Sequence, residues 1–88
     1  MNVRLNKKHQ KTLEAIFSAQ TPATLSWRRI EVLFKALGAT KKERAGSGVV
    51  FQLNGKRVTF HIPHPQKEVH RYQIRRARNF LQEVGITP

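Results

Sequence analysis

The chain has 88 residues with 17 Lys and Arg against five acidic residues, and its formal net charge is +12 at pH 7. This length predicts one small domain with a thin core, and this charge favours nucleic acid over a membrane as partner, because the basic residues are spread over several predicted elements. The absence of cysteine excludes disulfides and thiol chemistry, and the absence of a long apolar run or a signal-peptide pattern predicts a cytoplasmic protein.

Two amphipathic helices are predicted in the first half of the chain. The apolar spacing predicts the first over residues 6–19, and the Thr-Pro pair at 21–22 ends it. We assign residues 1–22 to an N-terminal helical extension. Ser26 is a favourable N-cap for the second helix, and Gly38 ends that helix as a left-handed C-cap. The two apolar stripes consist of Leu13, Ile16 and Phe17 and of Trp27, Ile30, Leu33, Phe34 and Leu37.

Three strands are predicted next, over residues 40–44, 48–54 and 56–62. The Asn-Gly dipeptide at 54–55 is a strong hairpin signal, because both turn positions need positive φ. A two-residue loop pairs Leu53 with Lys56, Phe51 with Val58, Val49 with Phe60 and Gly48 with His61. One face of this hairpin is apolar, whereas the face that carries His61 is mixed and is expected to meet solvent or a ligand. A slip of one residue would turn His61 into the core.

The last helix is predicted to begin between Val69 and Gln73, and Gly85 and Ile86 resemble a Schellman ending. Its buried stripe consists of Ile74, Ala77, Phe80, Leu81 and Val84. The order of elements predicts an α+β fold that resembles double-stranded-RNA-binding domains (dsRBD-like): α-β-β-β-α with a three-stranded antiparallel sheet and an extra N-terminal helix. We assign residues 23–88 to this core, within a single domain overall.

The last helix also carries a basic face. Arg71, Arg75 and Arg78 stand at positions i, i+4 and i+7, a spacing that suits a line of phosphates. The alternative is a solvated basic face, and the total charge of the chain favours binding. Tyr72 lies outside a clear core pattern, and it either stacks on a base or covers the edge of the sheet.

Several segments, in this order and spacing, resemble the HicA family of toxins from bacterial toxin–antitoxin systems, over about residues 23–88. They are Leu37-Gly38-Ala39, Gly46-Ser47, the hairpin that ends at Pro63, His64-Pro65-Gln66-Lys67-Glu68-Val69 and Val84-Gly85-Ile86. The resemblance implies a small mRNA interferase, an endoribonuclease that needs no metal or other cofactor. It also implies two partners, mRNA as substrate and a HicB-like antitoxin that holds the toxin inactive.

One departure from the family concerns the catalytic residue. The family usually has Gly-Ser-His, with that histidine taken as catalytic, whereas this chain has Gly46-Ser47-Gly48. Because directly opposed residues have Cβ atoms about 4.5–5.5 Å apart, the imidazole of His61 is able to reach the space above Gly48. Our hypothesis is that the catalytic histidine has crossed the ladder. In one alternative, Gly48 is a bulge or close-approach glycine and His61 is an exposed strand residue. In another, the chain is an inactivated toxin, by nature or by design.

The predicted acid–base residue is His61, because histidine exchanges protons near neutral pH and RNA carries its own 2′-OH nucleophile. The family's His-x-x-Lys-Glu motif adds His64, whose alternative role is to cap the loop or the following turn. The predicted RNA-binding cations are Arg57, Lys67, Arg71, Arg75 and Arg78. No metal site is expected, since the acidic residues are scattered and the two histidines lack a third ligand. The alternatives for the whole chain are a non-catalytic RNA-binding module, a structural ribonucleoprotein component and a DNA-binding accessory protein.

Overall fold

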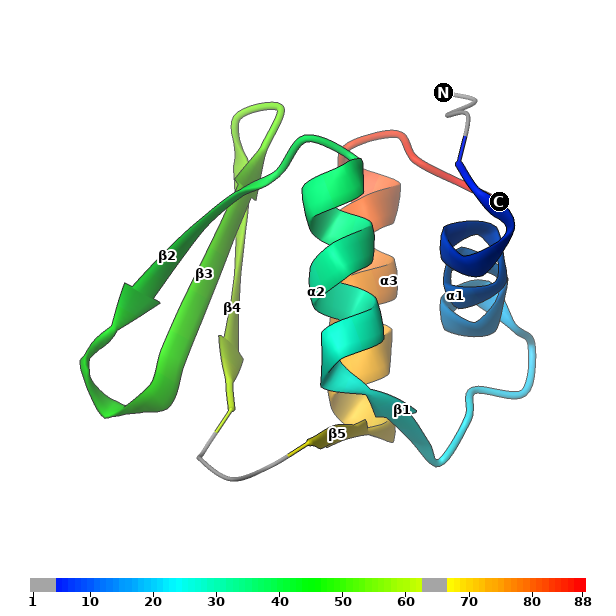
Figure 1. Ribbon diagram of the computed structural model, residues 1–88, viewed down its shortest axis with the longest axis horizontal. Helices are drawn as coiled ribbons and strands as arrows, with labels where there is room; N and C mark the ends of the chain where they lie inside the picture. Colours follow the sequence, from blue (N-terminus) through cyan, green and yellow to red (C-terminus); the bar gives the residue numbers. More distant parts are fainter. Residues whose placement is uncertain (1–4, 63–66) are drawn as a thin grey trace.

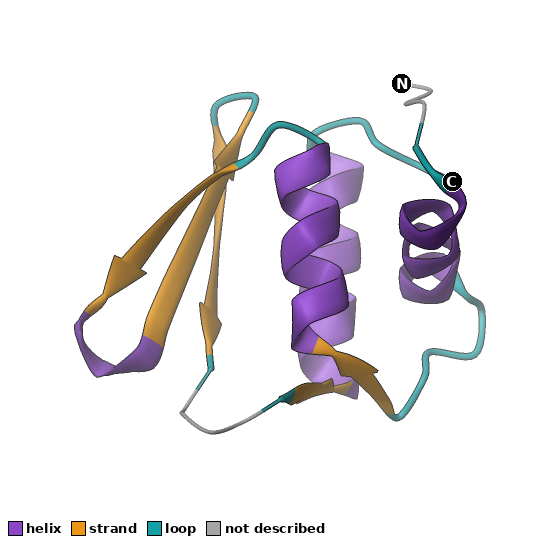
Figure 2. Ribbon diagram, viewed as in Figure 1, coloured by secondary structure: helices purple, strands orange, loops and turns teal. Residues whose placement is uncertain are grey.

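The computed structural model describes residues 5–62 and 67–88, and it confirms the predicted α+β class. A three-stranded antiparallel sheet of order β2-β3-β4 forms one outer layer, α2 and α3 form the middle layer, and α1 lies beyond them (Figures 1 and 2). The helices are α1 (Lys7–Phe17), α2 (Trp27–Ala36) and α3 (Arg71–Glu83), and a 3₁₀ turn, η1, spans Ala45–Ser47. The strands are β1 (Thr24–Ser26), β2 (Thr40–Arg44), β3 (Gly48–Leu53), β4 (Lys56–His61) and β5 (Glu68–His70).

The core lies between the sheet and the middle helices, and aromatic rings fill its centre. The ring of Phe34 from α2 lies 5.0 Å from that of Phe51 and 5.7 Å from that of Phe80. Trp27 packs against Phe60 with ring centroids 5.2 Å apart. Tilted and edge-on contacts of this kind add to the stability that burial of each ring supplies. The apolar face of the hairpin therefore packs on helices, as predicted.

The ends of the middle helices follow the predicted capping residues. The Ser26 hydroxyl accepts a hydrogen bond from the backbone N–H of Arg29 at the start of α2. Gly38 and Gly85, which follow α2 and α3, have φ of +97° and +80°, where a side chain would be strained. After α3, the N–H of Ile86 donates to a carbonyl of the last helical turn at 2.8 Å. This geometry is the predicted Schellman ending.

The hairpin has the predicted register. Asn54 and Gly55 have φ of 51° and 78°, as a type I′ turn requires. From this turn the pairing runs without a bulge to Gly48 opposite His61 at the open end. On its other side, β3 pairs with β2, which brings Arg44 opposite Gly48. The two hairpin strands end at Leu53 and His61, each one residue earlier than predicted.

One element is absent from the prediction, a two-stranded ribbon of β1 and β5. The two strands pair antiparallel with Leu25 opposite Val69, and both of these side chains are buried. The N–H of Trp27 extends the pairing by donating to the carbonyl of Lys67 at 2.9 Å. Segments of three residues show no readable period, and these two lie far apart in the sequence, so local patterns do not reveal them. The ribbon holds the starts of α2 and α3 together.

Arginines of α3 tie α1 to the rest of the molecule. The Nε of Arg78 donates to the carbonyl of Ile16 at 2.7 Å. Its Nη2 donates to the carbonyl of Ser18 and to the hydroxyl of Thr21, both at 2.9 Å. Arg71 adds a bond from its Nε to the carbonyl of Thr21 at 3.2 Å. The Ile16 carbonyl belongs to the last turn of α1, where the helix dipole favours a nearby cation.

We predict that Arg78→Met lowers the free energy of unfolding by about 2 kcal/mol, because it removes charged donors from partly buried carbonyls while keeping an unbranched apolar stem. Arg75→Met is the matched control: Arg75 is an exposed residue of the same helix, and its loss is expected to change stability by less than about 0.5 kcal/mol. Urea denaturation measures both variants, and equal losses in the two would contradict this structural role of Arg78.

Candidate nucleic-acid interface

His61 is the last residue of β4, and its side chain is exposed on the polar face of the sheet, directly opposite Gly48. Residues that flank a two-residue turn form a hydrogen-bonded pair, and the alternation along an antiparallel ladder makes Gly48–His61 a non-hydrogen-bonded pair. The N–H of Ile62 donates to the carbonyl of Ser47 at 3.0 Å, which fits this alternation. Side chains approach most closely in such pairs. The side chain of His61 therefore lies beside the space that a side chain at position 48 would occupy.

Gly48 does not need to be glycine for backbone reasons. Its φ of −77° and ψ of 136° are ordinary for a strand. A Cβ built on it would lie 3.5 Å from the Cβ of Arg44 and 3.9 Å from the carbonyl oxygen of Ala45, which are normal contacts. Its pairing with both neighbouring strands is regular. The interpretation of Gly48 as a bulge or close-approach glycine is therefore wrong.

A buried glutamine of α3 fixes the end of β4. The Nε2 of Gln73 donates to the backbone carbonyl of His61 at 3.0 Å, and its Oε1 accepts from the N–H of His70 at 3.0 Å. Gln73 is only 2% exposed, so these bonds satisfy its amide where water has little access. Sequence reasoning missed this residue. The signal available in the sequence was a polar residue directly before Ile74, where the buried stripe of the last helix begins.

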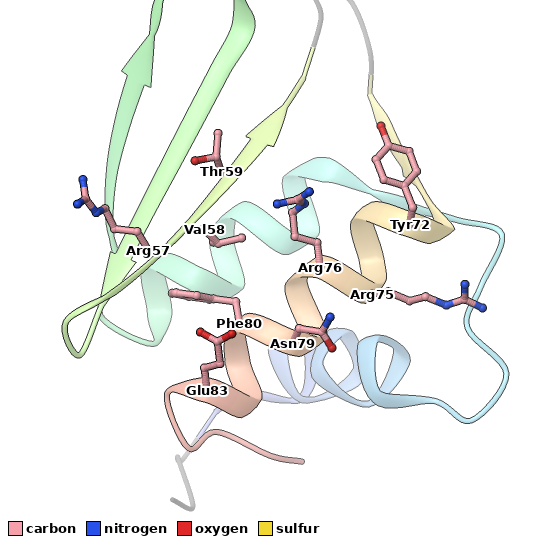
Figure 3. A pocket seen from close by; sticks show the side chains of 9 residues that line it. All are labelled: Arg57, Val58, Thr59, Tyr72, Arg75, Arg76, Asn79, Phe80 and Glu83. Atoms are coloured by element: carbon pink, nitrogen blue, oxygen red, sulfur yellow. The ribbon is translucent and has the colours of Figure 1, made fainter.

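A groove runs between the free edge of β4 and the outer face of α3, with a volume of about 580 Å³ (Figure 3). We call it the β4–α3 groove, and it is lined by Arg57, Val58, Thr59, Tyr72, Arg75, Arg76, Asn79, Phe80 and Glu83. A smaller hollow adjoins it and shares Thr59, Tyr72 and Arg76. That hollow is completed by Phe60, His61 and Gln73. His61 therefore lies at one end of a continuous depression.

The predicted arginine row of α3 is divided between two places. Arg75 lines the groove, as does Arg57 from β4. Arg71 and Arg78 instead donate hydrogen bonds to α1 and to the segment that follows it, and their contact with RNA stays a prediction. Arg76, which the helical spacing put beside the row, reaches from α3 toward β4 in Figure 3. The groove thus gathers a different set of cations from the one that the spacing suggested.

Lys67 and Lys41 do not line the β4–α3 groove. Lys67 is exposed just before β5, and His64 lies outside the described residues. Lys41 of β2 pairs with Glu31 of α2 and with Glu43, and the hydrogen bond to Glu31 raises the pKa of Lys41 above its ordinary value.

Within residues 5–62 and 67–88, no three His, Asp or Glu side chains are grouped closely enough to hold a metal ion. In the same residues, no helix has the length and apolar character needed to cross a membrane.

One family model matches most of this structure. The model described as HicA toxin of bacterial toxin-antitoxin matches residues 27–86, from the start of α2 to the turn after α3. The match therefore includes the sheet, the β4–α3 groove and His61, and it leaves α1 and β1 outside. No curated protein and no solved structure matches the chain.

The backbone at position 48 generates a stability prediction. Gly48→Ala is expected to stabilise the protein by roughly 0.5 kcal/mol, because the strand conformation accepts a Cβ and the unfolded chain loses freedom. Gly46→Ala, two residues away, is expected to destabilise it by about 1 kcal/mol, because Gly46 has φ of +76° although its surroundings are open. Urea denaturation compares the two variants, and a clear loss of stability in Gly48→Ala would show that glycine is required there.

Proposed function

This chain belongs to the HicA toxin family, and from that premise we propose that it is a metal-independent endoribonuclease that cleaves mRNA by histidine acid–base chemistry. The observation that carries the proposal is the position of His61. It is exposed directly opposite Gly48, where the family usually has its catalytic histidine, and it lies at the end of a groove lined by arginines. An imidazole there is available to RNA held in the groove.

The reaction needs two proton transfers and a cation. The RNA 2′-OH attacks the adjacent phosphorus, a bond from the 2′-oxygen to phosphorus forms, and the bond from phosphorus to the 5′-oxygen breaks. A base takes the proton of the attacking hydroxyl, and an acid gives one to the leaving 5′-oxygen. In the proposal, His61 performs one of these transfers and His64 the other. Arg76, which lines the same hollow as His61, supplies positive charge for the phosphorane that forms between the two steps.

The proposal includes a HicB-like antitoxin as the second partner. The charge of +12 gives this protein a strong attraction for any surface of complementary charge. An antitoxin with acidic residues facing the β4–α3 groove would associate rapidly and would exclude RNA from His61. A cytoplasmic location agrees with mRNA as substrate, and we include it in the proposal.

A second candidate function is favoured by the backbone at position 48. Because a Cβ fits there without strain, the backbone at that position accepts residues other than glycine, and replacement of a histidine by glycine would leave a folded but inactive toxin. Such a protein would still bind RNA through the arginines of the groove. The second candidate is therefore a non-catalytic RNA-binding protein on the same fold.

We predict that the purified protein cleaves RNA in the presence of EDTA and that His61→Ala lowers the rate by about 10²–10⁴-fold, the usual contribution of a positioned acid or base. His9→Ala, a histidine of α1 outside the groove, is the matched control and is expected to keep the wild-type rate. Product separation on denaturing gels measures the rates, and urea denaturation verifies that each variant is folded.

Equal activity in the wild type and in His61→Ala would contradict the proposed role of His61. If the wild type is inactive and Gly48→His gains cleavage, the chain is a disabled toxin. If both are inactive, the RNA-binding function replaces the enzymatic one.

A further inference from the structure

Tyr72 has no role in the fold that explains its position. Among the described residues, Tyr72 is the large hydrophobic residue that is exposed, with a relative accessible surface of 64%. It lines both the β4–α3 groove and the adjoining hollow that contains His61. Since its ring is mostly open to solvent, it does not serve chiefly to cover the edge of the sheet. An exposed ring in a basic groove is the arrangement with which proteins stack on unpaired bases.

We propose that the β4–α3 groove holds a single, unpaired RNA strand, with one base stacked on Tyr72, the adjoining phosphate bound by Arg76 and a phosphate farther along the strand bound by Arg57. This inference rests on the proposed function, because it names the form of RNA that reaches His61. The faces of bases in a duplex are covered by their neighbours, so a stack on Tyr72 requires an unpaired nucleotide. Tyr72 is then a positioning residue, which places a nucleotide beside the histidine.

Four of the residues of α3 that line the groove form one stripe along the helix. Tyr72, Arg76, Asn79 and Glu83 stand at i, i+4, i+7 and i+11, which spans about 16 Å along the axis. Arg76 comes one turn after Tyr72, so a phosphate next to the stacked base meets a guanidinium. At the far end from His61, the carboxylate of Glu83 repels phosphate. Tyr72 and Arg76 therefore hold the strand at the end of the groove that adjoins His61, and Arg57 offsets part of the repulsion at the other end.

The facing wall of the groove offers hydrogen-bonding groups to the bases. β4 is an edge strand, and the alternation of its pairing with β3 turns the backbone N–H and C=O of Arg57, Thr59 and His61 toward α3. The carbonyl of His61 does accept a bond from Gln73 of α3, which agrees with this direction. The backbone groups of Thr59 and Arg57 thus face the groove, together with the amide of Asn79. Unpaired bases expose edges that are able to bind such groups.

The test measures binding without cleavage. The probe is a short, unstructured RNA with 2′-O-methyl riboses, which lack the nucleophile, and the same sequence is also annealed into a blunt duplex. Fluorescence anisotropy gives the affinity for each of the two probes. Both are measured at one fixed salt concentration, because salt changes every protein–nucleic acid affinity. We expect the single strand to bind more tightly than the duplex. We also expect Tyr72→Leu to weaken single-strand binding about tenfold and Tyr72→Phe to restore most of it, since the ring carries the stack.

A charge-matched pair controls for general attraction. Arg76→Gln is expected to weaken single-strand binding clearly more than Lys11→Gln, which removes the same charge from α1. Equal affinity for single strand and duplex, or an unchanged affinity in Tyr72→Leu, would overturn the inference. Because the probe cannot be cleaved, this outcome is independent of the cleavage assay. If the wild type fails to cleave RNA but Tyr72→Leu loses RNA binding, the nuclease proposal is refuted and the stacking site is supported.

Discussion

The register of the hairpin is the constraint on which the candidate site depends. The type I′ turn at Asn54-Gly55 sets β3 against β4, and every cross-strand pair up to Gly48–His61 follows from it. A shift of one residue would exchange the faces of β4, burying His61 and exposing Phe60 to solvent. Gln73 reinforces the register at the other end of the strand, because it binds the carbonyl of His61. Turn and glutamine together fix where the imidazole stands.

The helix α1, which lies outside the family match, changes which arginines of α3 line the groove. α1 lies beyond the middle helices, and Arg78 and Arg71 of α3 donate to the end of α1 and to the segment after it. These arginines stabilise the attachment of the extension, since each bond to a charged donor is worth more than a neutral one. Arg76 and Tyr72 lie on the side of α3 that faces β4. Arg71 and Arg78 therefore hold the extension in place, whereas Arg76 lines the groove.

The sequence was sufficient for the elements whose signals are local. Ser26, Gly38, the Asn54-Gly55 turn and the ending at Gly85 each act within a few residues of themselves, and each takes the predicted conformation. What was missed depends on partners distant in the sequence. The β1–β5 ribbon is too short to show a period, and the hydrogen bonds of Arg78 join residues of α3 to the end of α1. The helical spacing of the arginines therefore indicated a common face without revealing that Arg71 and Arg78 bond to α1 and the segment after it, whereas Arg75 lines the groove.

We propose that an imidazole in the space shared by positions 48 and 61 performs one of the two proton transfers, whichever strand supplies it. The most direct measurement is RNA cleavage in EDTA by His61→Gly and by the exchanged variant that combines His61→Gly with Gly48→His. We expect the single variant to lose cleavage and the exchanged variant to regain it, because the two positions are directly opposed. Undiminished cleavage by the single variant, or no recovery in a folded exchanged variant, would contradict the claim.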